Sequence, residues 1–163
     1  HFQDREALLA GLVDRWQARN TGSLVARCEA PAATISEATF NLFDCWVDPA
    51  LFDSRLEFAM RTWSLTDPAV AQAMRAADAE RIAAITGLFR RFGYGAAESD
   101  TRARTLYLTQ IGYIALRSDE SLAVRMGRMP DYVLTFSGVA PSAAEVAAFG
   151  ARHQIKSGAE AAT

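Results

Sequence analysis

Apolar residues recur at helical spacing along nearly the whole chain, whereas the strict alternation expected of a strand is almost absent. The first such segment carries Leu8, Leu12, Val13 and Trp16 on one side and charged residues over much of the rest. Asn and Gly favour the end of a helix, so this helix is expected from about residue 2 to 19, with a stop at Asn20 to Gly22. The pattern predicts an all-α fold.

Two Asp-Pro pairs predict the starts of further helices. Asp48 precedes Pro49, and Asp67 precedes Pro68. Each pair places a good N-cap residue directly before a proline at the first helical position, where the missing N–H of proline costs nothing.

The carboxy-terminal part is expected to contain two more helix starts. Pro130 is expected to begin a short helix over 131–136. Ser142 and Glu145 have the spacing of a capping box, which predicts the start of a last helix that ends near His153.

Composition restricts the class of protein. The chain has 163 residues, half of them apolar, and a formal net charge of -2. These values predict one globular domain over 1–153 and a flexible tail of small and polar residues over 154–163. No apolar run approaches the roughly 20 residues of a membrane span, and the net charge gives no general attraction to nucleic acid. Cys28 and Cys45 lack metal-ligand spacing, which favours two reduced thiols in a cytoplasmic protein.

The segment 97–117 is expected to be a helix whose second half is apolar almost all round. Such a helix must be covered on every side, either as the central helix of its own domain or between two subunits. Gly112 and Ala115 would allow a second helix to approach closely. Gln110 is a candidate ligand anchor, because a buried amide needs partners in protein, water or ligand; a satisfied core or interface amide is the alternative.

Motifs of catalysis and metal binding are absent from the sequence. Neither histidine lies in a Glu-x-x-His or His-Glu-x-x-His pattern, and there is no glycine-rich phosphate loop or Walker lysine. We therefore expect no metal, no cofactor and no enzymatic activity, since catalytic side chains would have to converge only in three dimensions. Arg61, Asp78 and Arg81 are expected to brace two helices by ion pairing.

Four segments in order carry a resemblance to a known family. They read HFQDREALLAGLVDRW, LEFAMRTWSLTDPAVAQAMRAADAERIAAITGLFRRFGY, ARTLYLTQIGYIALRSDES and RMPDYVLTFSGVAPSAAEVAAF. In this order the chain resembles the carboxy-terminal regulatory part of TetR/AcrR-family transcriptional regulators. The amino-terminal helix-turn-helix of that family is missing from it.

The resemblance implies a fold and a function. The fold is an antiparallel multi-helix regulatory domain that dimerises through a helical bundle, and residues 1–153 are its ligand-binding and dimerisation domain. The function is that of a bacterial one-component repressor: a small apolar or aromatic effector changes the spacing of the DNA-binding heads in a homodimer. Operator DNA is bound only through the missing region, and His1 is expected to contact a DNA phosphate in the intact protein.

The expected cavity has aromatic and polarisable walls with few charges. The candidate ligand-binding residues are Trp16, Phe40, Phe43, Trp46, Phe58, Met60, Trp63, Met74, Tyr107, Gln110 and Tyr113. The candidate dimer-interface residues are Tyr107, Ile111, Gly112, Ile114, Ala115, Met126, Met129, Tyr132 and Val133. Core packing is the alternative for each wall residue. A helical dimerisation module that senses nothing, or a small all-α enzyme, is the alternative for the domain.

Overall fold

The computed structural model describes the backbone of residues 5–160 and the side chains of residues 6–153. Every regular element among these residues is helical, so the all-α prediction is confirmed. The elements are α1 (Arg5–Trp16), the π-helical turn η1 (Gln17–Thr21), α2 (Gly22–Glu29), α3 (Ile35–Val47), α4 (Ser54–Ser64), α5 (Pro68–Arg91), α6 (Ala96–Ala115), α7 (Leu122–Ser137) and α8 (Ala143–Glu160). His1 lies outside the described residues, and so does its expected contact with DNA.

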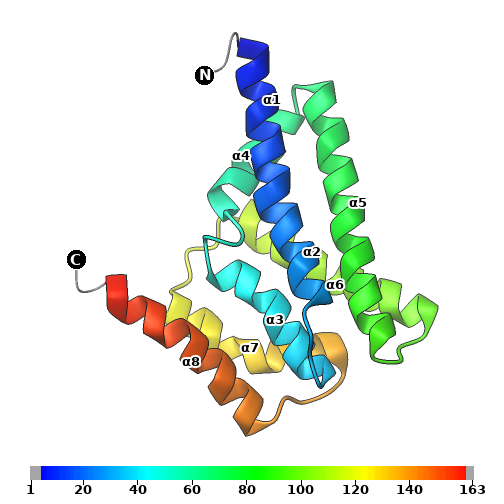
Figure 1. The fold of residues 1–163 in the computed structure, drawn as a ribbon, viewed down its shortest axis with the longest axis vertical. Coiled ribbons are helices and arrows are strands. Elements are labelled where there is room, and N and C mark those ends of the chain that lie inside the picture. The colour runs from blue at the N-terminus through cyan, green and yellow to red at the C-terminus, as the bar shows by residue number, and fades with distance from the viewer. Residues whose placement is uncertain (1–4, 161–163) are drawn as a thin grey trace.

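Residues 5–29 form one long helical rod, the amino-terminal rod. Figure 1 shows α1, η1 and α2 following one another without a break, with α5 beside them and running in the same direction. The helix α5 packs on α2, α4 and α6, and α3 packs on α2, α7 and α8. Among the described residues no helix is long and apolar enough to cross a membrane.

Two apolar clusters form the interior. The larger gathers side chains from α2, α3, α5, α6, α7 and α8. The smaller lies between α1, α4 and the first part of α5, and its buried members are Trp16, Met60, Val70, Met74 and Ala77. Arg81 lies between the two clusters. Its guanidinium carbon lies 5.2 Å from the ring centre of Trp16 in the smaller cluster and 5.3 Å from that of Phe52 in the larger.

Two of the predicted helix caps are confirmed. The Asp67 carboxylate accepts hydrogen bonds from the backbone N–H groups of Ala69 and Val70, at 2.9 and 3.2 Å, at the start of α5. Ser142 and Glu145 form the reciprocal capping box of α8: each side chain accepts the backbone N–H of the other, at 3.2 Å for Ser142 Oγ and 2.7 Å for Glu145 Oε2.

The predicted helix stop at Asn20 is wrong. The chain remains helical there and passes through η1 into α2. Asn20 is fully buried, and its amide donates to the Asp53 carbonyl at 3.2 Å and to the Glu57 carboxylate at 3.0 Å, while its Oδ1 accepts from the Asp53 N–H at 2.9 Å. Because these tertiary partners satisfy the side chain, the local preference of Asn for a helix end is overridden.

Two other predicted helix starts are wrong. Asp48 is the C-cap of α3, and the next helix begins only at Ser54, where the Asp53 carboxylate accepts two backbone N–H groups at 3.0 Å. Pro130 lies inside α7, which begins behind Ser121, the N-cap whose hydroxyl accepts the Val124 N–H at 3.3 Å. A proline inside a helix gives up a backbone hydrogen bond, so the neighbouring packing must maintain α7.

The last helix, α8, is held on α3. Phe149 stacks on Phe40 with ring centres 4.6 Å apart. Asp44, which is buried on α3, accepts a hydrogen bond from Arg152 at 3.1 Å, and its Oδ1 lies 2.8 Å from Nε2 of His153. The helix continues to Glu160, so the predicted end near His153 is wrong and the predicted boundary between domain and tail falls inside a helix.

Candidate functional site

A small, partly enclosed cavity lies among α3, α6 and α7. Its lining residues are Phe43, Trp46, Leu106, Thr109, Gln110, Tyr113, Arg125, Met129, Tyr132 and Phe136. The cavity volume is about 30 Å³. One water needs about 10–15 Å³ by the same measure, so in this conformation the cavity has room for about two waters and is too small for an aromatic ring.

Aromatic contacts fix the walls of the cavity. Tyr132 and Phe136 stack with ring centres 5.4 Å apart, and Tyr113 meets Tyr132 edge to face at 6.3 Å. The two tyrosine hydroxyls lie 2.6 Å apart, and Arg128 donates to that of Tyr113 at 3.0 Å. Phe43 lies 6.4 Å from Phe136 and joins the wall from α3.

Two side chains at the cavity have a polar group without a protein partner, and the indole N–H of Trp46 is the buried one. Trp46 is only 8 % exposed, and its indole N–H has no hydrogen-bond acceptor among the described residues. Gln110 is 9 % exposed, and no described residue hydrogen-bonds to its side-chain amide. Buried polar groups are nearly always satisfied, so the indole N–H of Trp46 indicates a place for a polar ligand atom or water. The Gln110 amide has no protein partner to give up if it binds a ligand at the same cavity.

Only some of the predicted ligand-binding residues line this cavity. Phe43, Trp46, Gln110 and Tyr113 line the cavity together. The others do not line it. Trp16, Met60, Trp63 and Met74 belong to or pack on the smaller apolar cluster, Phe40 stacks on α8 and Tyr107 joins a polar network. Phe58 packs on the larger cluster and lines a second, open hollow together with Gln110 and Tyr113.

The sequence did not indicate several lining residues. Arg125 and Phe136 were not singled out, and Met129 and Tyr132 were assigned to the dimer interface. Met129, Tyr132 and Phe136 follow each other at helical spacing, a signal that the wrong helix start at Pro130 concealed.

The predicted dimer-interface residues differ in their exposure on the single chain. Tyr107, Ile114, Met129 and Val133 are buried inside the single chain, at 1, 6, 6 and 0 % exposure, so they offer no surface to a partner. Ile111, Gly112, Met126 and Tyr132 are partly covered, and Ala115 is exposed. The exposed leucines of these two helices are instead Leu108, Leu122 and Leu134.

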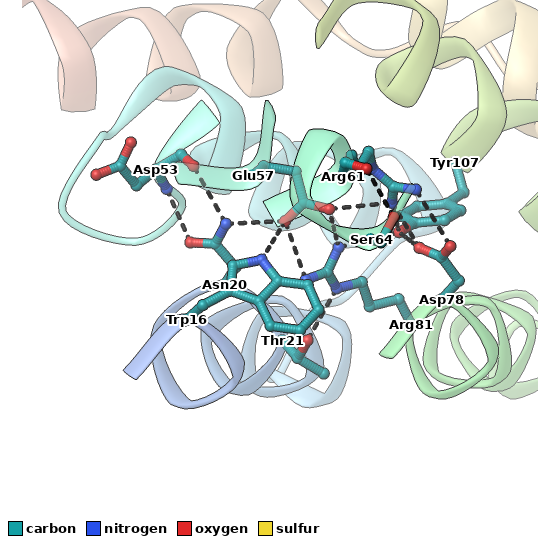
Figure 2. A network of polar contacts seen from close by, with 10 residues as sticks. All are labelled: Trp16, Asn20, Thr21, Asp53, Glu57, Arg61, Ser64, Asp78, Arg81 and Tyr107. Atoms are coloured by element: carbon teal, nitrogen blue, oxygen red, sulfur yellow. Dashed lines mark hydrogen bonds and ion pairs between the residues drawn. The ribbon is translucent and has the colours of Figure 1, made fainter. Parts of the chain in front are cut away.

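A buried ion pair joins four helical elements (Figure 2). Glu57 of α4 and Arg81 of α5 are both fully buried, and Arg81 donates two hydrogen bonds to the carboxylate, at 2.8 and 3.2 Å. Trp16 of α1 and Asn20 of η1 donate to the same carboxylate, at 2.7 and 3.0 Å. Arg81 also donates to the hydroxyl of Thr21 at 2.9 Å.

Tyr107 connects α6 to this network (Figure 2). Its hydroxyl donates to Asp78 at 2.6 Å and accepts from Arg81 and Arg61 at 3.0 and 3.1 Å. Arg61 pairs with Asp78 at 2.5 Å and with Glu57 at 3.0 Å. The predicted bracing by Arg61, Asp78 and Arg81 is therefore confirmed, although the sequence did not indicate Glu57 as their common partner.

Charge complementarity keeps the buried carboxylate of Glu57 ionised. Burial raises the pKa of Glu57, but the charge and hydrogen bonds of Arg81 and the amide of Asn20 outweigh it, so that the pKa lies below its ordinary value of 4.5. Burial likewise raises the pKa of Tyr107, which leaves the phenol protonated and able to donate to Asp78.

Potential metal ligands do not gather at one place among the described residues. No group of three or more His, Cys, Asp or Glu side chains there could hold a metal ion. Cys28 and Cys45 are free and buried, and burial raises the pKa of both thiols.

Comparison of the chain with family models, curated proteins and solved structures gives no significant match.

The ion pair predicts a pH-dependent stability. Replacing Glu57 by Gln leaves the Arg81 charge buried without its main counter-charge, and we expect the unfolding free energy to fall by about 3–5 kcal/mol at neutral pH. Because the folded pKa of Glu57 is lowered, its contribution is present above the ordinary value of 4.5 and is lost as the pH falls through the folded pKa. Urea unfolding of wild type and Glu57→Gln between neutral pH and about pH 3 measures this loss.

The matched control is Glu80→Gln, on an exposed carboxylate of α5. It should change the unfolding free energy by less than about 0.5 kcal/mol. A difference between wild type and Glu57→Gln that stays constant over this pH range would contradict the ionised, buried pair.

Proposed function

We propose that this chain is the ligand-sensing and dimerising part of a transcription regulator of the TetR/AcrR type. The observation that carries the sensing proposal is the double role of α6. Gln110 and Tyr113 of this helix line the cavity, and Tyr107, one turn before Gln110, hydrogen-bonds to the network that holds η1. A ligand that moves α6 therefore acts on the amino-terminal rod through hydrogen bonds.

The size of the cavity supports a response to binding. Benzene fits a cavity of about 150 Å³, far more than the 30 Å³ present here. An aromatic effector must therefore separate α6 or α7 from α3, and it stabilises a conformation that differs from this one. Its differential affinity for the two conformations is the free energy that drives the change.

The amino-terminal rod is the element that receives this change. Trp16 and Asn20, on α1 and η1, both donate to Glu57, and Thr21 accepts from Arg81. A shift of the Tyr107 hydroxyl alters the partners of Arg81 and hence the position of the rod. A π-helical turn such as η1 is a frequent feature of functional sites in long helices.

The resemblance to TetR/AcrR regulators supplies the rest of the proposal. Its four segments fall on α1, on α4 and α5, on α6, and on α7 and α8. In such a regulator a helix-turn-helix ahead of α1 binds operator DNA, and a small apolar or aromatic effector alters the spacing of the two heads in the dimer. An apolar cavity with a few polar groups suits this kind of effector.

The sensing proposal can be tested with N-phenyl-1-naphthylamine, a neutral aromatic probe whose fluorescence increases in an apolar site. We expect it to bind the chain and to change amide hydrogen exchange in α3, α6 and α7. Because the network couples α6 to the rod, exchange in η1 should change as well. Hydrogen exchange followed by mass spectrometry, with and without the probe, measures both responses.

The variant Tyr107→Phe tests the coupling between α6 and the rod. It retains the ring and removes the hydroxyl that contacts Asp78 and Arg81. It should bind the probe as wild type does and lose the response of η1. Failure of the wild type to bind the probe would favour a dimerisation module that senses nothing. A wild-type response confined to α3, α6 and α7 would contradict the coupling.

The dimer is proposed on the outer face of α6 and α7. These helices pack on each other, and Leu108 and Leu134 are 59 and 45 % exposed. A second copy of the chain would cover these leucines, and a two-fold contact brings each residue near its own copy.

For this reason Leu108→Asp should split the dimer, because it places a charge in each half of an apolar seam. Leu65→Asp is the control: Leu65, at the end of α4, is 82 % exposed and lies on neither helix. Light scattering at tens of micromolar gives the molar mass of each protein. The interface is wrong if the wild type is monomeric or if Leu108→Asp remains dimeric.

A further inference from the structure

A second hollow adjoins the cavity and carries positive charge. It is an open groove of about 880 Å³ that shares Gln110, Tyr113 and Arg125 with the cavity. Arg55 of α4 and Arg117, just beyond α6, line it as well. Asp119 is the one acidic residue of its lining.

The three arginines of the groove have no carboxylate partner among the described residues. Arg117 lies over the ring of Phe58 at 5.4 Å, and Arg125 lies over that of Tyr113 at 5.8 Å and donates to the Trp46 carbonyl at 3.4 Å. By contrast Arg128, one turn after Arg125 on α7, pairs with Glu120 at 2.9 Å. The guanidinium groups of the groove are therefore available for an anion.

Arg117 occupies a backbone position that favours glycine. Its φ is 50°, the one positive φ of a non-glycine residue among those described. It follows the C-cap of α6, where the N–H groups of Arg117 and Ser118 close the helix on the carbonyls of Ile114 and Tyr113, at 3.1 and 3.2 Å. An arginine at a position with this conformational cost, with its side chain at the groove, points to a role for the charge.

We propose that the effector is an aromatic carboxylate, whose ring enters the cavity while its carboxylate binds the arginines of the groove. Arg125 lines both hollows and is placed to receive the carboxylate where they meet, and Arg117 and Arg55 add to the positive field. Tyr132 and Phe136, which stack on each other with 3° between their ring planes, both line the cavity and are aromatic partners for the ring of the effector. Arginine binds carboxylates through charge-assisted hydrogen bonds.

This inference rests on the proposed sensing function and specifies its effector. The alternative amphipathic ligand, an alkyl carboxylate, shares the anionic head and lacks the ring. A neutral aromatic compound shares the ring and lacks the head. The two halves of the proposal can therefore be tested separately.

The test compares 2-naphthoate, 2-naphthalenemethanol and decanoate as competitors of bound N-phenyl-1-naphthylamine. Wild type should bind naphthoate at least about tenfold more tightly than the alcohol, the scale expected for a hydrogen bond to a charged group. This preference should decrease with added salt, since the groove is open to solvent. Decanoate should bind more weakly than naphthoate.

Two variants test which arginines produce the preference for the carboxylate over the alcohol. Arg125→Met should abolish the preference for naphthoate over the alcohol. Arg117→Gly should weaken naphthoate several-fold although the chain stays at least as stable, because glycine adopts the positive φ freely. Arg75→Met, on an exposed arginine of α5 outside both hollows, should bind all three compounds as wild type does.

Each unfavourable result has a distinct meaning. Equal binding of naphthoate and the alcohol, with the probe still displaced, would overturn the carboxylate and leave the sensing function standing. Tighter binding of decanoate would overturn the aromatic ring. An unchanged preference in both Arg125→Met and Arg117→Gly would overturn the assignment to this groove. If the probe itself does not bind, the proposed sensing function fails first.

Discussion

The rest of the structure depends on the buried ion pair between Glu57 and Arg81. Two charges removed from water are costly, and a pair of this kind adds little to stability compared with apolar side chains of the same volume. Its contribution is to fix an arrangement: the Glu57 carboxylate accepts hydrogen bonds from Trp16, Asn20 and Arg81 together, which sets the mutual position of α1, η1, α4 and α5. Tyr107 adds α6 to this set. A shift of α6 therefore disturbs a network that tolerates few alternatives.

How far the fold could be predicted depends on the range of the interactions involved. The cap at Asp67 was predicted correctly because it involves only residues two and three positions away. Asn20 and Asp48 carry the same kind of local signal, but tertiary contacts keep Asn20 inside a helix, and Asp53 caps the helix expected to start after Asp48. Pro130 was misread because α7 tolerates a proline that the local rule places at a helix start.

An aromatic cavity could be predicted from the sequence more easily than the residues that line it. Aromatic composition indicated an apolar cavity, and Phe43 and Trp46, three residues apart on one helix, do share its wall. Periodicity does not show which of two apolar clusters a residue joins. Trp16 was therefore predicted at the same cavity as Phe43 and Trp46, although it belongs to the smaller cluster, on the other side of Arg81. Glu57 was missed because its burial depends on three other helical elements and leaves no mark in the sequence around it.

The central claim is that Trp16 and Tyr107, which do not hydrogen-bond to each other, are coupled through Glu57 and Arg81. A double-mutant cycle of Trp16→Phe and Tyr107→Phe, measured by urea unfolding, tests it most directly. We expect an interaction free energy above about 0.5 kcal/mol, the range found for residues within one hydrogen-bond network. The matched cycle of Trp16→Phe with Tyr94→Phe, whose hydroxyl donates to the Ser137 carbonyl outside the network, should be additive. If both cycles are additive within about 0.3 kcal/mol, the network does not couple the cavity helix to the amino-terminal rod.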